Sequence, residues 1–396
     1  MNAAIEVLLR VSAFTLAALS ATESASLQTG APVEAGAPVQ AGAPIQTAAT
    51  PGKTYFYMRT WPGGLIQFDP ATDTVVKSLA NKHGLGYDCD LTYDKKRFVM
   101  ITGQRSFVEV VDVATMEIID EQSFEEQGFI VRVSDIREQP GGERWYVKVD
   151  KVEKKLDQFV IKEPEWIDYD VKEHKAGKRM KELPKAIRRG ARVSPDGTKW
   201  HVFDKDLTIL DPKTLDEIGK IELSKPMYSG LGPISIRGDD FFENKNPDAY
   251  RFMYTMRDPV NKNRTMCGLV DIDIAGMKIG RVVEWGAAPR AGNLHYTQDH
   301  RLGVGQARSM ERRSQADGRD PEITLYSFDL ETGKKIKETR VEVRNGLSIG
   351  AISPDGSKIY LDGRGNQLVV YDRDHKYLKT IELPGDSDGQ IMTVTQ

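Results

Sequence analysis

One pattern recurs seven times along this chain and limits its fold more than any other feature. Each copy is a strand that ends in Asp, a short turn that contains Thr or Lys, and a further strand, as in LIQFDPATDTVVKSL from Leu65. The marker aspartates are Asp69, Asp112, Asp170, Asp211, Asp273, Asp329 and Asp372. They lie roughly 50 residues apart on average, which is the size of a four-stranded propeller blade.

Each such meander is apolar on both faces and cannot bury them alone. Radial stacking of seven meanders buries these faces and leaves only short strand edges. The repeats therefore predict an all-β, seven-bladed β-propeller over residues 53–396. Blade one has no inner strand before Thr54, whereas an unassigned strand, Ile391–Thr395, follows blade seven. We expect this C-terminal strand to complete blade one and to close the ring.

A second marker, Ser-Pro-Asp-Gly, occurs at Ser194–Gly197 and at Ser353–Gly356. Proline presets one turn angle and glycine accepts a positive φ, so each copy predicts a tight turn. Both copies fall where the two inner strands of a blade join. Asp94-Lys95-Lys96 and Gln298-Asp299-His300 occupy the matching positions in two other blades.

The N-terminus resembles a targeting segment. The apolar stretch Val11–Ala21 follows Arg10 and precedes small residues. This pattern indicates a secretory signal peptide over residues 1–25, too short for a membrane span, and predicts a periplasmic or secreted protein. Residues 26–52 repeat Gly-Ala-Pro and predict a disordered linker.

Charge and cysteine content exclude several classes of function. The 55 basic and 58 acidic side chains give a net charge of −3, which does not support nucleic-acid binding. Cys89 and Cys267 are the only cysteines, and no CxxCH motif occurs. A disulfide framework, a four-cysteine metal site and covalent haem c are therefore excluded. We expect no cofactor in this chain.

The propeller geometry sorts the histidines. With the strands of a blade named A to D from the axis outward, the D–A and B–C loops share one face, where ligand sites usually lie at the channel mouth. His174 and His375 fall in C–D turns, His300 falls in an A–B turn, and His201 falls on a strand B. Only His83 and His295 fall in or beside D–A segments.

We therefore predict a site at this channel mouth. Histidine and tyrosine suit acid–base chemistry, and arginine suits anion recognition. Because a wet channel makes any propeller mouth polar, packing or solvation alone also explains these side chains. The predicted catalytic residues are His83, Tyr87 and His295, and the predicted substrate-binding residues are Asp88, Arg188, Tyr228, Tyr296 and Asp388.

The same region also contains side chains of the types that bind metal ions. His83 and His295 with Asp88 or Asp90 supply suitable ligand types. Metal sites usually need three or more ligands, and no HxH or HxxxH pair preorganises them here. No metal is therefore predicted.

Two B–C loops are long, Met256–Thr265 and Gln306–Pro321, and the second carries four arginines. Such length indicates either a lid or docking surface, or a solvated insertion.

The Ser-Pro-Asp-Gly turns and Asp-containing hairpins of residues 54–396 resemble the YVTN-type repeat proteins. Two stretches, residues 252–280 and 353–386, further resemble the β subunit of quinohemoprotein amine dehydrogenase. This resemblance implies a periplasmic propeller subunit that binds a quinone-bearing small chain and walls the cavity for a small amine. Cysteine tryptophylquinone and haem c are then expected on partner chains, the haem on a dihaem cytochrome.

The Gly-Ala-Pro leader and the arginine-rich loop depart from that family pattern. They leave two other functions open. One is a stand-alone propeller enzyme of lactonase or lyase type acting at the channel mouth. The other is a binding propeller without catalysis.

Overall fold

The computed structural model describes the propeller and not the N-terminal leader. The described residues are 52–188, 191–225, 234–236, 249–258, 261, 265–287, 291–308, 322–342, 348–362 and 365–396. The predicted signal peptide and the predicted linker up to residue 51 lie outside them.

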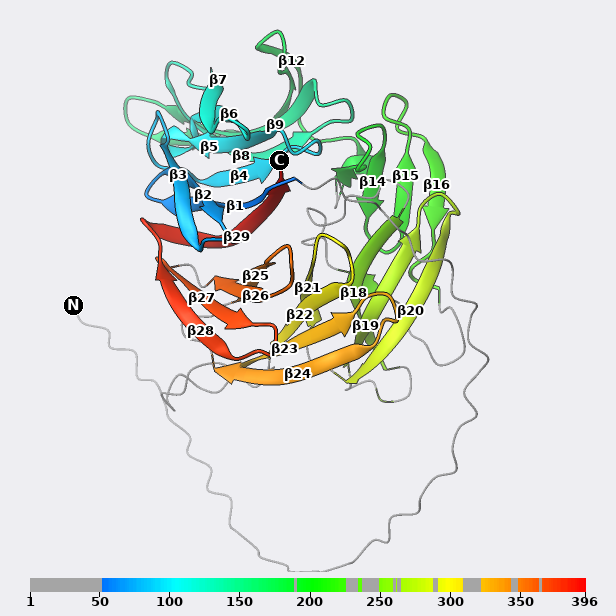
Figure 1. Cartoon of the computed structure of the whole chain (residues 1–396). Helices are drawn as coiled ribbons and strands as arrows, with labels where there is room; N and C mark the ends of the chain where they lie inside the picture. The colour runs from blue at the N-terminus through cyan, green and yellow to red at the C-terminus, as the bar shows by residue number, and fades with distance from the viewer. Residues whose placement is uncertain are drawn as a thin grey trace, which may run out of the picture. The chain divides into compact units, whose positions relative to one another are not determined.

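The described strands form seven antiparallel sheets around one axis, as the sequence predicts (Figure 1). Blade one contains β29 (Asp386–Thr395), β1 (Thr54–Trp61), β2 (Gly64–Asp69) and β3 (Thr74–Ala80). Blade two contains β4 (Asp88–Leu91), β5 (Arg97–Thr102), β6 (Phe107–Asp112) and β7 (Glu117–Ser123), with the 3-10 turn η1 (Gly103–Arg105) between β5 and β6. Blade three contains β8 (Phe129–Glu138), β9 (Arg144–Lys154), β10 (Phe159–Ile161), β11 (Glu165–Asp170) and β12 (Lys175–Met180).

The remaining blades follow the chain in order. Blade four contains β13 (Ala191–Val193), β14 (Trp200–Phe203), β15 (Leu207–Leu210) and β16 (Glu217–Ile221), preceded by η2 (Lys185–Ile187). Blade five contains β17 (Ser235–Ile236), β18 (Ala249–Arg257), β19 (Thr265–Asp273) and β20 (Lys278–Ala287). Blade six contains β21 (Ala291–Tyr296), β22 (Leu302–Arg308), β23 (Glu322–Asp329) and β24 (Lys335–Glu342). Blade seven contains β25 (Ser348–Ile352), β26 (Lys358–Asp362), β27 (Gln367–Asp372) and β28 (Tyr377–Glu382).

The predicted closure of the ring is confirmed. The C-terminal strand β29 pairs with β1 from Thr54↔Thr395 to Trp61↔Asp386, so it supplies the inner strand of blade one. It begins at Asp386, five residues before the expected Ile391, because pairing continues across a bulge between Met58 and Thr60. The closing strand therefore contacts β1 along nearly its whole length.

The marker aspartates perform the turn role that their spacing indicates. Each lies at or just after the end of strand C, and one of its carboxylate oxygens accepts a hydrogen bond from a backbone N–H in the C–D turn. Those N–H groups belong to Ala71, Thr115, Glu173, Thr214, Gly276, Thr332 and Asp374, at 2.7–2.9 Å. The aspartate thus fixes the hairpin locally, whatever surrounds the blade.

The A–B turns also match prediction. Gly197 and Gly356 of the two Ser-Pro-Asp-Gly turns have φ values of 74° and 71°. Lys95 and His300 occupy the same left-handed position in blades two and six, with φ of 57° in both. Glycine adopts this conformation without steric cost, whereas the two other side chains do not.

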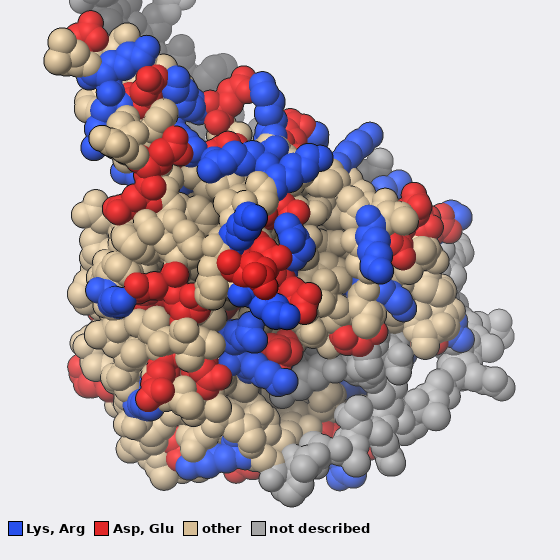
Figure 2. Space-filling view, turned by 90° about the horizontal axis from the view of Figure 1, so that it is seen from above, with Lys and Arg blue, Asp and Glu red and all other residues tan. Residues whose placement is uncertain are grey.

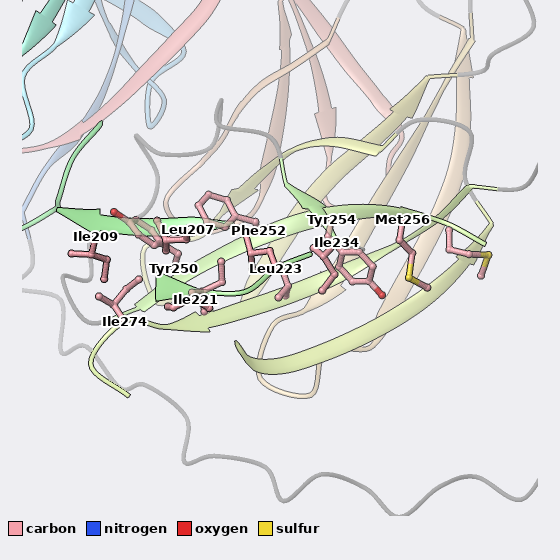
Figure 3. Close-up of a cluster of buried hydrophobic side chains, with 13 residues drawn as sticks. Leu207, Ile209, Ile221, Leu223, Ile234, Tyr250, Phe252, Tyr254, Met256 and Ile274 are labelled. Carbon is pink, nitrogen blue, oxygen red and sulfur yellow. The ribbon is translucent and has the colours of Figure 1, made fainter. Parts of the chain in front are cut away.

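Apolar side chains fill the spaces between neighbouring blades. Between blades four and five, Leu207 and Ile209 on β15 pack with Tyr250 and Phe252 on β18 (Figure 3). The closing strand serves two such interfaces. Its Ile391 packs in the cluster of blades seven and one, and its Met392 and Val394 pack in the cluster of blades one and two.

The placement of four histidines agrees with the sequence. His174 and His375 lie in C–D turns, His300 lies in an A–B turn, and His201 lies on β14. His201 is buried, and its Nδ1 lies 2.6 Å from the Tyr250 hydroxyl. Within the described ranges there is no helix with the length and apolar character needed to cross a membrane.

Candidate functional site

The loop that carries His83 and Tyr87 is anchored by a buried carboxylate. Glu109 on β6 is fully buried. Its Oε1 accepts hydrogen bonds from His83 N and Thr102 Oγ1, both at 2.9 Å, and its Oε2 accepts one from Lys82 N at 3.2 Å. The loop between blades one and two is therefore held against strands B and C of blade two.

This anchoring turns two of the three predicted catalytic side chains, His83 and Tyr87, toward blade two. The His83 ring stacks on Phe107 with centroids 3.7 Å apart, and its Nε2 lies 3.2 Å from Glu121 on the outermost strand. Tyr87 is exposed, and the guanidinium of Arg105 lies 3.1 Å from the centre of its ring. The structure thus brings His83 and Tyr87 together with η1. Their catalytic roles stay predictions.

The other predicted residues are spread over the ring. Asp88 begins β4, and its Oδ1 accepts the Cys89 N–H at 3.0 Å. Arg188 is exposed between blades three and four, and its guanidinium pairs with Glu182. Tyr228 and the side chain of Asp388 lie outside the described residues.

His295 and Tyr296 point to opposite sides of β21. Tyr296 and Leu294 pack in the apolar cluster between blades five and six. His295 lies between them in the strand, so it faces the other side, where it is 9% exposed. His300 packs against Tyr296 at 4.7 Å between ring centroids. Strand alternation therefore separates these two predicted site residues.

Blade three carries a feature that the sequence did not predict. Beyond its last pairing with β11, strand β9 continues and pairs with β10. We call residues 150–163 the blade-three extension. It lies at the end of the blade where the D–A and B–C loops lie, and Leu156 is fully exposed, Phe159 69% and Ile161 83%. These three are the most exposed large apolar side chains of the described chain.

Charges around the blade-three extension are paired with one another. Lys162 lies 2.7 Å from Glu153, Lys181 lies 2.7 Å from Glu163, and Lys151 lies 2.7 Å from Glu165. Basic and acidic side chains also alternate over the part of the ring surface shown in Figure 2. The blade-three extension therefore presents apolar side chains among charges that largely neutralise one another.

The channel also contains a cavity near the A–B turns. Its volume is about 360 Å³, and side chains of blades two to five line it. Two carboxyl groups reach its wall, Asp90 on β4 and Glu138 at the end of β8. Glu138 Oε2 accepts the Tyr93 N–H at 2.8 Å. Tyr93 in turn packs against Gly197, where an added Cβ would lie 2.3 Å from the ring.

Both carboxyl groups hold their protons more tightly than usual. The surrounding protein desolvates Asp90, and together with the neighbouring charge of Asp88 this raises the pKa of Asp90 to about 6, against the opposing effect of Arg192. Burial raises the pKa of Glu138 to about 7, although the Tyr93 N–H favours its ionised form. Two carboxyl groups that titrate near neutral pH are suited to proton exchange or to binding a cation.

The sequence indicates Asp90 only as a possible metal ligand and gives no signal for Glu138. Forty-eight positions separate them, and they meet because blades two and three are neighbours. The alternation of polar and apolar residues in Asp88-Cys-Asp-Leu91 is the one local signal that places Asp90 on the channel side. Over the described ranges, no group of three or more His, Cys, Asp or Glu side chains is placed to hold a metal ion.

No family model matches the chain, and no curated protein matches it significantly. Among solved structures, a protein of unknown function from Desulfotomaculum acetoxidans DSM 771 is 11% identical, with a TM-score of 0.48 over 87% of this chain and 99% of that one. Dihydro-heme d1 dehydrogenase NirN is 12% identical, with a TM-score of 0.47 over 88% of this chain and 76% of that one. Kuenenia stuttgartiensis hydrazine synthase is 14% identical, with a TM-score of 0.41 over 78% and 94%. At these values the likeness concerns the fold and carries nothing about activity.

Proposed function

We propose that this chain is the propeller subunit of a periplasmic amine-oxidising quinoprotein complex. In this proposal it binds partner chains and carries no redox cofactor of its own. The observation that carries the proposal is the blade-three extension, with Leu156, Phe159 and Ile161 exposed at its surface. The sequence resemblance of residues 252–280 and 353–386 indicates the type of complex.

The physical reason lies in the cost of exposing these side chains. Burying a large apolar side chain stabilises a protein by about 1.5–3 kcal/mol, so three of them together favour association by several kcal/mol. Phe159 and Ile161 are two residues apart in β10 and so share one face of the strand. Exposed apolar anchors surrounded by paired charges resemble the core and rim of a protein–protein interface.

The redox chemistry would belong to the partner chains. Amine oxidation needs an electron acceptor, which in quinoproteins is supplied by the cofactor. The two cysteines of this chain are buried in different blades, and the sequence has no haem attachment motif. The proposal therefore assigns cysteine tryptophylquinone to a small partner chain and haem c to a dihaem cytochrome chain, with a small amine as substrate.

The test is purification of the tagged full chain from the organism that encodes it. We expect haem-containing and quinone-containing chains to co-purify and the complex to reduce a dye when an amine is added. The double variant Phe159→Ser/Ile161→Ser should lose at least nine-tenths of the co-purified chains. The matched control Ile119→Ser/Leu378→Ser changes exposed apolar residues on β7 and β28 and should retain them.

Recovery of wild-type protein as a lone chain contradicts the proposal. A lone chain that hydrolyses a lactone or cleaves its substrate by elimination would identify the stand-alone enzyme instead. Equal recovery of partners by both double variants would show that the blade-three extension is not their binding surface.

A further inference from the structure

The cavity near the A–B turns is a separate feature from the proposed partner surface. Glu138 lies at one end of β8, and Phe129, which pairs with Glu153 of the blade-three extension, begins the strand at the other end. Nine residue steps separate them, which corresponds to about 30 Å along the strand. The volume of about 360 Å³ falls within the range of small-molecule sites.

Two carboxyl groups line the cavity, and each is either neutral or negatively charged, depending on pH. Asp90 and Glu138 line the cavity from neighbouring blades, and the charge of Asp90 contributes to the raised pKa of Glu138. The one hydrogen bond found for Glu138 within the described residues uses Oε2 and comes from the Tyr93 N–H. A bound ammonium group would stabilise the ionised forms of both carboxyl groups, which desolvation by the surrounding protein otherwise disfavours.

A second polar group of the wall requires an acceptor. Trp145 on β9 lines the cavity and is 2% exposed, and its indole Nε1–H has no hydrogen-bond partner among the described residues. An indole nitrogen can only donate a hydrogen bond, so neither an apolar group nor a cation can satisfy it. A buried donor without a partner destabilises the protein, and a ligand oxygen that accepts the hydrogen bond would remove this penalty.

The rest of the wall is largely apolar or aromatic. It includes Leu91, Val99, Ile136, Val193 and Tyr250. Arg137 also lines the cavity, but its guanidinium is held by Asp135 at 3.2 Å and by the Ile187 carbonyl at 3.0 Å. The wall thus combines two carboxyl groups and one indole donor with an apolar surface, and Asp94, Lys95 and Arg192 add charges of both signs.

We propose that this cavity binds a small zwitterion with an apolar side chain, of the chemical class of the apolar α-amino acids. The ammonium group lies against Asp90 and Glu138, a carboxylate oxygen accepts the Trp145 Nε1–H, and the side chain contacts the apolar wall. The inference goes beyond the proposed function and does not rest on it, because the isolated full chain is sufficient for binding.

Isothermal titration calorimetry of the full chain with valine, leucine, methionine and phenylalanine tests the site. We expect at least one to bind with a Kd below about 1 mM. Phenethylamine lacks the carboxylate and 3-phenylpropionate lacks the ammonium group, so each should bind at least tenfold more weakly than phenylalanine. Titration in two buffers of different ionisation enthalpy should show proton release, because the ammonium group favours ionised carboxyl groups.

Two conservative variants separate the two contacts. Glu138→Gln should weaken amino-acid binding at least tenfold and abolish most of the proton release. Trp145→Phe keeps the ring but removes the donor, so it should weaken phenylalanine binding while leaving phenethylamine binding unchanged. Glu117→Gln, on the exposed strand β7, is the matched control and should bind as wild type. Circular dichroism confirms that each variant is folded.

Three results would overturn the proposal. The first is no heat of binding for any of the four amino acids at about 10 mM, where even weak sites are measurable. The second is equal affinity for phenylalanine and phenethylamine. The third is wild-type binding by folded Glu138→Gln and Trp145→Phe. A chain that binds amino acids but recruits no partner would disprove only the proposed function.

Discussion

Removal of the C-terminal strand should unfold the propeller. Deletion of residues 390–396 takes away three buried side chains of β29, namely Ile391, Met392 and Val394. At about 1.5–3 kcal/mol each, their loss amounts to roughly 5–9 kcal/mol. Typical domains are stable by about 5–15 kcal/mol, so little or no net stability would remain. We expect an insoluble chain, or one that melts far below the full chain.

Two single substitutions test the contribution of β29 with a smaller change. Met392→Ala leaves the backbone pairing of β29 intact and should cost about 2–5 kcal/mol of the free energy of unfolding. Leu378→Ala removes an apolar side chain of similar size that is 48% exposed on the outer strand β28, and it should change stability by less than about 0.5 kcal/mol. Both are compared with wild type by differential scanning fluorimetry and urea unfolding.

This prediction is contradicted if the deleted chain melts at the wild-type temperature, or if Met392→Ala and Leu378→Ala both leave stability unchanged. Either result would mean that the edge of β1 does not need β29. The propeller would then tolerate an open ring.

Three further predictions follow from single positions. Gly197→Ala should lower stability by about 1–3 kcal/mol in urea unfolding, because φ is 74° there and the new Cβ would meet the Tyr93 ring; an unchanged midpoint would contradict this contact. Glu138 has a higher pKa in the folded chain than in the unfolded chain, so the folded chain binds its proton more tightly. The free energy of unfolding should therefore fall by up to about 3 kcal/mol as pH rises from about 4 to 7. Glu138→Gln should flatten this profile and stabilise the chain at pH 8. His83→Ala should lower the free energy of unfolding by about 0.5–1.5 kcal/mol in urea unfolding, because its stacking on Phe107 is lost. Loss of turnover by the folded variant would support the predicted catalytic role of His83.

The blade repeat was predictable because its chemistry is local. Each marker aspartate binds N–H groups two or three residues ahead, so turn and spacing are readable without knowledge of the neighbouring blades. Closure was predictable from strand counting alone. The start of β29 was not, because the bulge between Met58 and Thr60 extends the pairing beyond the apolar residues.

The candidate sites were harder to predict because they depend on contacts between blades. His83 belongs to a loop of the predicted face, but buried Glu109, which is distant in sequence, turns that loop toward blade two. Asp90 and Glu138 meet only through the stacking of their blades. The blade-three extension lies within the most degenerate repeat, where no motif distinguishes a longer hairpin from an ordinary B–C loop.

The position of β29 has a consequence for biosynthesis. Thr54 and Thr395 are paired although 341 residues separate them. On the ribosome, blades two to seven can form in turn, whereas blade one waits without its inner strand until β29 has emerged. Until then the edge of β1 and two apolar interfaces stay uncovered, which is the state most prone to aggregation or chaperone capture. A chain that ends before β29 therefore exposes the edge of β1 and two apolar interfaces that the closed ring covers.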